Sequence, residues 1–250
     1  IMLLTGTDPT EVLQQVDPTG GMAGSSPVSQ REFSAAEQEL ADFSSVVLAS
    51  TEDTWGAVFE QMDGTYQQPK LVLFSGSVQS ACGFAQAAMG PFYCPSDRSV
   101  YLDLSFFEDL RARFDAPGDF AQAYVIAHEV GHHVQNLLGI MDDVQAAQQR
   151  AGEKQANELS VRLELQADFL AGVWAHYARE SQGFLDAADI EEGLNAASAV
   201  GDDRIQKRQQ GYVVPDAFTH GTSEQRVRWF RKGMETGSLE ACDTFSARQL

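Results

Sequence analysis

The chain has 250 residues, enough to bury a hydrophobic core as one large domain or as a domain with a helical extension. Its composition, 43% hydrophobic and 21% charged, is ordinary for a soluble globular protein and excludes collagen-like, repetitive and broadly disordered chains. With 17 basic and 36 acidic side chains the net charge is −19, and a surface this negative repels phosphate backbones, so no nucleic-acid partner is expected.

Residues 1–30 predict a tether ahead of a folded domain over residues 31–250. The chain starts Ile1-Met2-Leu3-Leu4, without an initiator Met, and continues through a Gly/Ser/Pro-rich stretch at 18–29. No stretch approaches the roughly 18 to 20 apolar residues that cross a bilayer. We interpret the start as the trimmed end of something longer, which is compatible with a removed signal or anchor segment.

Residues 31–108 predict a helix, two strands and the start of another helix. Apolar residues recur at helical spacings over 31–62. Short apolar strands are expected at 70–76 and 99–103. The sequence Ser105-Phe106-Phe107-Glu108 has the capping-box pattern that begins a helix.

Two of the three cysteines have the spacing of a disulfide-closed loop. Cys82 and Cys94 lie 12 residues apart, around two glycines and a proline. A bridge there would add about 3 kcal/mol in the chain-entropy model and would suit an oxidising compartment. The alternative is a pair of unrelated buried thiols. Cys242 is then left over, and we expect it to be a small buried hydrophobe.

The most informative helix is expected between a Pro-Gly pair and Gly139. Asp119 is the predicted N-cap, with Gln122 at the N3 position, and Gly139 ends the helix. An apolar stripe with alternating spacings of four and three defines its core face. His128 and His132 lie in the neighbouring stripe, so they share one face, one turn apart.

Two further helices complete the pattern. A long one is expected over 155–179, with a core stripe and, along its margin, Glu164 and Asp168. The last is signalled by the capping box Thr222-Ser223-Glu224-Gln225, ahead of apolar residues at helical spacing.

The segment His128-Glu129-Val130-Gly131-His132 predicts a zinc site. Histidines at i and i+4 of a helix project side by side and reach one ion, while the intervening Glu faces the bound water. A catalytic zinc needs about three protein ligands and an open fourth position. The alternative is a pair of ordinary helix histidines.

The third ligand is expected on a separate element, and Glu164 is the first candidate. Asp168, one turn later, would accept the spare N–H of a ligating histidine and fix its tautomer. The alternative is that both carboxylates are merely solvated. Asp168 itself, His176 and His220 are the other candidate ligands.

The pattern predicts separate roles for the remaining histidines. His133 points about 100° around the helix from His132, so it should miss the metal and be a hydrogen-bonding or surface residue. His176 is expected to be a satisfied helix-surface residue. His220 precedes the last helix in a loop, where it would donate to the oxyanion formed from a peptide carbonyl, or have no catalytic part.

Together these motifs resemble the bacterial family of putative neutral zinc metallopeptidases, from about Arg31 onward. The resemblance is carried by Cys82-Gly83-Phe84-Ala85, the segments 90–95 and 101–104, His128 through Gln135, Glu164-Leu165-Gln166-Ala167-Asp168, His220-Gly221-Thr222-Ser223 and Arg228-Trp229-Phe230. It implies a mainly helical α+β, zincin-like domain with a small sheet beside the HExxH helix. The Glu-x-x-x-Asp element resembles that of the glutamate zincins, which implies Glu164 as ligand and Asp168 as orienter. It also implies an extracytoplasmic domain anchored to the membrane by a helix that is missing here.

The sequence therefore predicts a peptidase with one zinc ion per chain. Glu129 is expected to take the proton of the attacking water and return it to the leaving amine. The strand 99–103 is the expected sheet edge for pairing with a peptide substrate. Two rivals stay open: a zinc amidohydrolase acting on non-protein amides, and a non-catalytic or latent zinc-binding protein.

Overall fold

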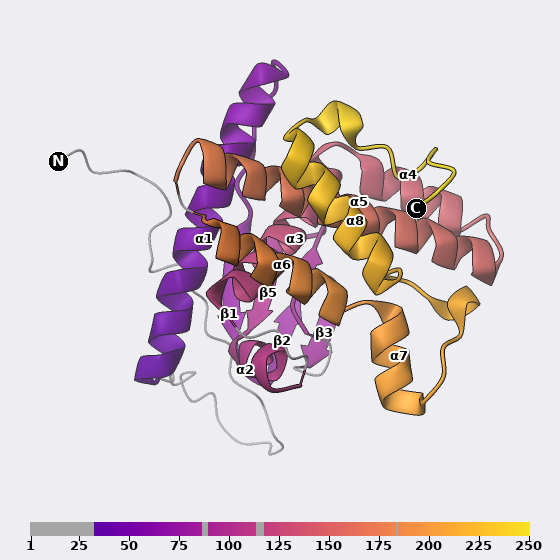
Figure 1. Ribbon diagram of the computed structural model, residues 1–250, viewed down its shortest axis with the longest axis horizontal. Coiled ribbons are helices and arrows are strands. Elements are labelled where there is room, and N and C mark those ends of the chain that lie inside the picture. The colour runs from indigo at the N-terminus through magenta and orange to yellow at the C-terminus, as the bar shows by residue number, and fades with distance from the viewer. Residues whose placement is uncertain (1–32, 87–89, 114–117, 184) are drawn as a thin grey trace, which may run out of the picture.

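The computed structural model describes residues 33–86, 90–113, 118–183 and 185–250, which form a mainly helical α+β fold with a small sheet, as predicted (Figure 1). The predicted tether over 1–30 lies outside the described residues. The helices are α1 (Ala35–Gln61), α2 (Leu104–Arg113), α3 (Asp119–Leu137), α4 (Ile140–Gln148), α5 (Glu153–Glu180), α6 (Ala187–Ala199), α7 (Asp202–Gln210) and α8 (Ser223–Thr236). The strands are β1 (Lys70–Phe74), β2 (Ser77–Ser80), β3 (Gly83–Gln86), β4 (Phe92–Cys94) and β5 (Ser99–Asp103).

The main sheet has the order β1-β5-β4, with β5 in the centre. It pairs with β1 in parallel and with β4 antiparallel, as in Leu71↔Val100 and Tyr93↔Val100. The strand predicted at 99–103 is confirmed. The expectation that it offers a free edge to a substrate is wrong, because both of its sides are already hydrogen-bonded. The edges of this sheet are β1 and β4.

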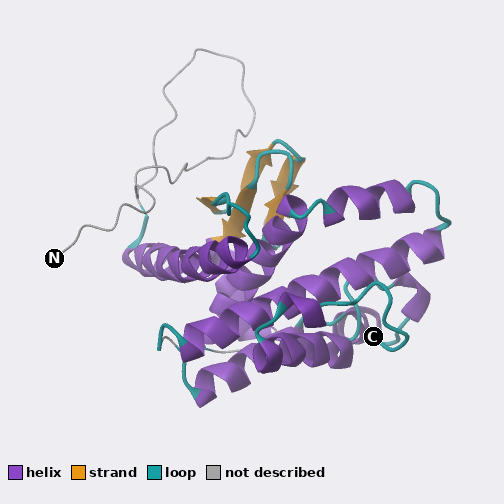
Figure 2. Cartoon of the chain, turned by 90° about the horizontal axis from the view of Figure 1, so that it is seen from above, coloured by secondary structure: helices purple, strands orange, loops and turns teal. Residues whose placement is uncertain are grey.

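The two faces of the sheet pack against different partners. Leu73 and Leu102 point into the main core with the helices. Phe74 and Tyr101 belong instead to a smaller core that contains residues of the β2–β3 hairpin. The disulfide between Cys82 and Cys94 joins the turn of this hairpin to β4. In Figure 2 the strands gather at one side of the molecule, and most of the helices lie on the other.

Two of the predicted helix starts differ from the structure. The N-cap of α3 is Gly118, and no side chain hydrogen bonds there as a local cap. Asp119 is therefore the first helical residue and not the cap. The Glu192 carboxylate of α6 accepts the N–H of Phe120 (3.3 Å) where a local cap would. The helix α2 begins at Leu104, one residue before Ser105, the first residue of the predicted capping box. In the structure the N–H of Ser105 donates to Asp103 Oδ1 (2.8 Å).

Two other local predictions are confirmed. Thr222 and Gln225 form the predicted capping box at the start of α8. Gly139, with φ 76°, follows the end of α3 and begins α4 in the left-handed conformation that favours glycine.

Glycines set the spacing between α5 and α8, which cross in Figure 1. A Cβ on Gly172 would lie 2.0 Å from the carbonyl oxygen of Phe230, and one on Gly233 would lie 2.0 Å from that of Phe169. Both distances are far inside van der Waals contact. The two backbones therefore pack directly on each other, and a side chain from α8 is brought close to the polar margin of α5.

Candidate metal centre

A glycine inside the His-Glu-Val-Gly-His segment brings α3 against α5. A Cβ on Gly131 would lie 2.9 Å from the carbonyl oxygen of Ala167, closer than real Cβ atoms approach. Any larger residue would push the helices apart. Because Ala167 lies one turn after Glu164 on α5, this close approach brings the histidine face of α3 within reach of Glu164.

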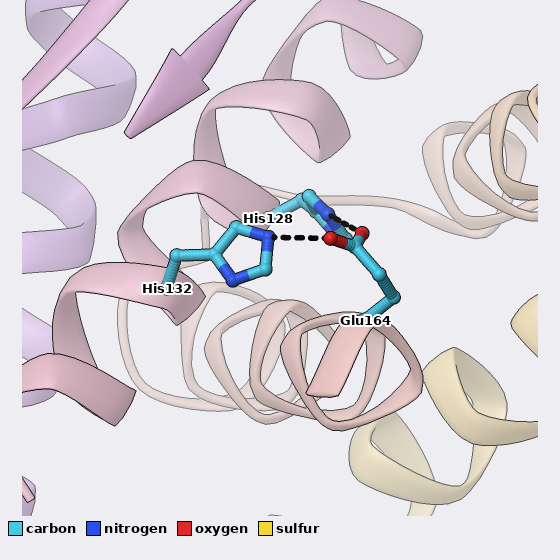
Figure 3. Close-up of side chains that lie close together, drawn as sticks. All are labelled: His128, His132 and Glu164. Atoms are coloured by element: carbon cyan, nitrogen blue, oxygen red, sulfur yellow. Dashed lines mark hydrogen bonds and ion pairs between the residues drawn. The ribbon is translucent and has the colours of Figure 1, made fainter. Parts of the chain in front are cut away.

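His128, His132 and Glu164 converge, with the histidines coming from α3 and the glutamate from α5 (Figure 3). His128 Nε2 lies 3.1 Å from Glu164 Oε2, and His132 Nε2 lies 3.4 Å from Glu164 Oε1. One ligand atom from each residue lies within 4.8 Å of the others. The structure thus brings together the three residues predicted as ligands.

The hydrogen bonds of the two histidines fit a cation at this point. His128 Nδ1 lies 2.9 Å from Asp168 Oδ1, and His132 Nδ1 lies 2.8 Å from Gln135 Oε1. When Nδ1–H donates to these oxygens, the lone pair of each Nε2 faces a carboxylate oxygen, an arrangement of acceptors that needs a positive charge between them. Zinc bonds of about 2.0–2.1 Å in tetrahedral geometry place neighbouring ligand atoms about 3.3 Å apart, close to the separations of 3.1 and 3.4 Å between the histidine nitrogens and the Glu164 oxygens.

The protein groups alone already favour positive charge between the histidines and Glu164. Burial disfavours every charged form here, but neighbours outweigh it. Asp168 and Glu164 raise the pKa of His128 to about 10. His132 and His128 hold the pKa of the Glu164 carboxyl well below its usual range. The carboxylates of Glu164 and Asp168 therefore favour a positive charge at the two histidines.

Asp168 belongs to a buried network that α8 completes. Arg226 Nε donates to Asp168 Oδ2 (2.8 Å) and Arg226 Nη2 donates to Asp168 Oδ1 (2.9 Å). The hydroxyl of Tyr124, on α3, donates to the same Oδ1. Although burial opposes ionisation, Arg226 and then His128 lower the pKa of Asp168 to about 2. Asp168 is thus an ionised acceptor, fixed in place for the Nδ1–H of His128.

Arg226 and Gln135 were not among the residues assigned to the site from the sequence. Arg226 is 4% exposed, and it shares the buried stripe of α8 with Ser223 and Phe230. An arginine at an apolar position of a helix was the available signal, since a buried Arg needs an anionic partner. For Gln135 the signal was its place in the same stripe as His132.

Glu129 lies beside the cluster without a protein partner. It is 7% exposed, and nowhere in the described chain does a residue donate a hydrogen bond to its carboxylate. Burial raises its pKa, an effect that His132 and His128 oppose. The carboxylate is therefore free to interact with a group bound at the centre, such as a water molecule.

His220 lies in a loop that packs on α5 next to Glu164. The Cβ position of Gly221 is 3.3 Å from side-chain carbons of Val161 and Leu165, which flank Glu164 in the helix. Asp202 holds this loop: its Oδ2 accepts the N–H groups of Thr219 and His220, each at 2.7 Å. The side chain of His220 is half exposed, and its Nδ1 lies 3.3 Å from Asp202 Oδ1.

The two remaining histidines lie away from the centre. His133 Nδ1 pairs with the hydroxyl of Tyr93 (2.9 Å) and its Nε2 with the carbonyl of Gln67 (2.5 Å), so it is a buried hydrogen-bonding residue that joins α3 to β4. His176 Nδ1 pairs with the carbonyl of Met234 (2.8 Å) between α5 and α8. Neither residue contributes an atom to the cluster.

Comparison with known proteins places the chain in a family. The profile of the family described as "Putative neutral zinc metallopeptidase" matches residues 1–245. The uncharacterized protein YpfJ of Escherichia coli (strain K12) is 57% identical over 234 residues, covering 92% of this chain and 81% of the relative. The uncharacterized protein Rv2575 of Mycobacterium tuberculosis (strain H37Rv) is 42% identical over 260 residues, covering 99% of this chain and 86% of the relative. No solved structure matches. The chain belongs to the putative neutral zinc metallopeptidase family.

Proposed function

We propose that this chain is a zinc-dependent peptidase in which His128, His132 and Glu164 hold one zinc ion. The observation that carries the proposal is the convergence of two histidine Nε2 atoms on the Glu164 carboxylate, beside the unpartnered carboxylate of Glu129. When bound, zinc lowers the pKa of its water toward about 7 and polarises the carbonyl of the substrate.

Glu129 is proposed as the general base. Its carboxylate accepts the proton of the attacking water and returns it to the leaving amine. Burial raises its pKa above that of a solvated glutamate, which brings its basicity closer to that needed for proton transfer near neutral pH. Because no protein donor occupies this carboxylate within the described residues, its oxygen lone pairs are available to the water.

His220 is proposed to donate a hydrogen bond to the oxyanion of the substrate. Support comes from the position of its loop against the α5 residues that flank Glu164, and from Asp202, which raises the pKa of His220 by hydrogen bonding and so favours the imidazolium donor. Replacing His220 by Asn should lower kcat by about 10²–10³-fold with little change in KM. Steady-state kinetics on one cleaved peptide measures this, and an unchanged kcat would leave His220 as a simple neighbour of α8.

A peptide substrate also needs a surface that binds its main chain. Since β5 is central, the edges of the sheet are β1 and β4, and β4 is the edge that packs against α3. We propose that an extended peptide lies along β4 towards the centre, pairing through main-chain hydrogen bonds.

The disulfide between Cys82 and Cys94 supports an extracytoplasmic location, because structural disulfides persist in oxidising compartments. Among the described residues, no helix is long and apolar enough to span a membrane. We propose that the parent protein is attached to the membrane through a segment that precedes this domain.

Removal of the metal tests the function directly. The zinc-loaded chain, the chelator-stripped chain and the stripped chain with zinc restored are incubated with a diverse peptide library, and products are identified by mass spectrometry. We expect cuts at peptide bonds that disappear with the metal and return with it. Cleavage of small amides but not peptides would favour an amidohydrolase. No cleavage with one zinc per chain would favour a latent or binding protein.

A further inference from the structure

The two histidines of the centre are held by chemically different partners. His128 donates to Asp168, a carboxylate that is itself paired with Arg226. His132 faces Gln135, an uncharged amide three residues later on α3. Gln135 is fully buried, and its side chain lies between α3 and α5. A buried amide needs a partner for each of its donors and for its oxygen, so its orientation is informative.

The contacts of Gln135 leave one orientation. Its Nε2 lies 2.7 Å from the carbonyl oxygen of Leu163 and 3.0 Å from Gln166 Oε1, both on α5. A backbone carbonyl only accepts hydrogen bonds, so the NH₂ group of Gln135 must face Leu163. The oxygen Oε1 then faces His132 Nδ1 at 2.8 Å, and since Oε1 only accepts, Nδ1 must carry the proton.

This orientation has consequences for both helices. With the proton on Nδ1, the lone pair of His132 is on Nε2, the atom 3.4 Å from Glu164 Oε1. Leu163, the other partner of Gln135, directly precedes Glu164 in α5. One side chain thus connects the ring of His132 to the backbone next to Glu164.

We propose that Gln135 is a positioning residue of the metal centre: it fixes the tautomer of His132 and holds this ring at its ligating distance from Glu164. The inference rests on the metal centre of the proposed function. Because Gln135 is neutral, it supplies an acceptor to His132 without adding a buried charge to a region that already holds Glu129, Glu164 and Asp168. Partners of this kind tune metal affinity without touching the metal.

The test compares zinc affinities of the full chain by competition with a chelator. Gln135→Met keeps the approximate volume and removes the acceptor and both donors, and it is expected to weaken zinc binding by about 10–100-fold. Gln166→Met is the matched control: it removes one partner of the Gln135 amide but leaves the Leu163 carbonyl, which by itself fixes the orientation. We expect its zinc affinity to stay within about threefold of wild type. If Gln135→Met does not fold, the zinc affinity of Gln135→Asn is measured instead. It should also be weakened, because the shorter side chain cannot reach both His132 and Leu163.

A second readout separates positioning from packing. In zinc-loaded chains with ¹⁵N-labelled histidine, the Nδ1–H resonance of His132 should be protected from exchange in wild type and Gln166→Met, and exposed or lost in Gln135→Met. Wild-type zinc affinity together with a protected Nδ1–H in the Gln135 variants would overturn the inference and leave the proposed function standing. A wild-type chain that binds no zinc would overturn both.

Discussion

Replacing Glu129 by Gln is expected to lower kcat by about 10²–10⁴-fold while the chain still binds one zinc ion. The amide has the shape of the carboxylate but cannot take up a proton from water. Zinc binding should persist because the three proposed ligands are His128, His132 and Glu164, and Glu129 is not among the ligand atoms that cluster. The measurement is kcat on one peptide from the library, with metal content determined on the same sample.

The matched control is Glu158→Gln, which makes the same chemical change on the exposed face of α5. Its kcat should equal that of the wild type. Full activity of the Glu129 variant with zinc bound would show that another group, or the metal centre alone, activates the water. Loss of zinc from the variant would instead make Glu129 part of the binding set.

Replacing Arg226 by Met is expected to destabilise the chain by about 3–5 kcal/mol, the largest effect on stability that we predict. The variant removes the guanidinium that pairs with the fully buried carboxylate of Asp168, so Oδ2 loses its donor 2.8 Å away and only Oδ1 keeps partners, His128 and Tyr124. The measurement is the free energy of unfolding in urea of the variant and the wild type. Both are measured without metal, so that a change in zinc binding does not contribute to the difference in stability.

Arg228→Met, two residues along the same helix, is the control. Arg228 is partly exposed, pairs with Glu224 at 2.7 Å in an i,i+4 ion pair and donates to the carbonyl of Leu250. Because its removal leaves no buried charge without a partner, the expected loss is only about 1 kcal/mol. Combining Arg226→Met with Asp168→Asn should recover part of the loss, since no unpaired ion then remains buried. A loss of less than 1 kcal/mol for Arg226→Met alone would mean that the pair does not organise the site as described.

The parts of the site that could be predicted from the sequence are those governed by helix periodicity. His128 and His132 share a face because they are four residues apart, and the same spacing places Glu164 and Asp168 on one margin of α5. The pairing of these two faces followed from the chemistry of the motif, because a zinc site on one helix needs a ligand from another element.

The parts that could not be predicted depend on contacts between distant segments. Arg226 reaches Asp168 across 58 positions of the chain, and the Glu192 carboxylate meets the start of α3 across 72. Strand order is likewise non-local: the residues of β5 predict a strand, and only its pairing with β1 and β4 makes it central. Helix and strand periodicity describes neighbouring residues only, so it does not indicate which distant residue a side chain or strand will contact.

The central claim is that the centre binds zinc through two histidines and one carboxylate and keeps a position open for water. X-ray absorption at the zinc edge of the loaded chain tests it most directly, because imidazole, oxygen and sulfur ligands give distinct scattering. The account predicts two imidazole nitrogens at about 2.0–2.1 Å, oxygen ligands for the remainder and no sulfur. A third imidazole, as His220 would supply, or a sulfur from Cys242, would show a closed structural site and contradict it.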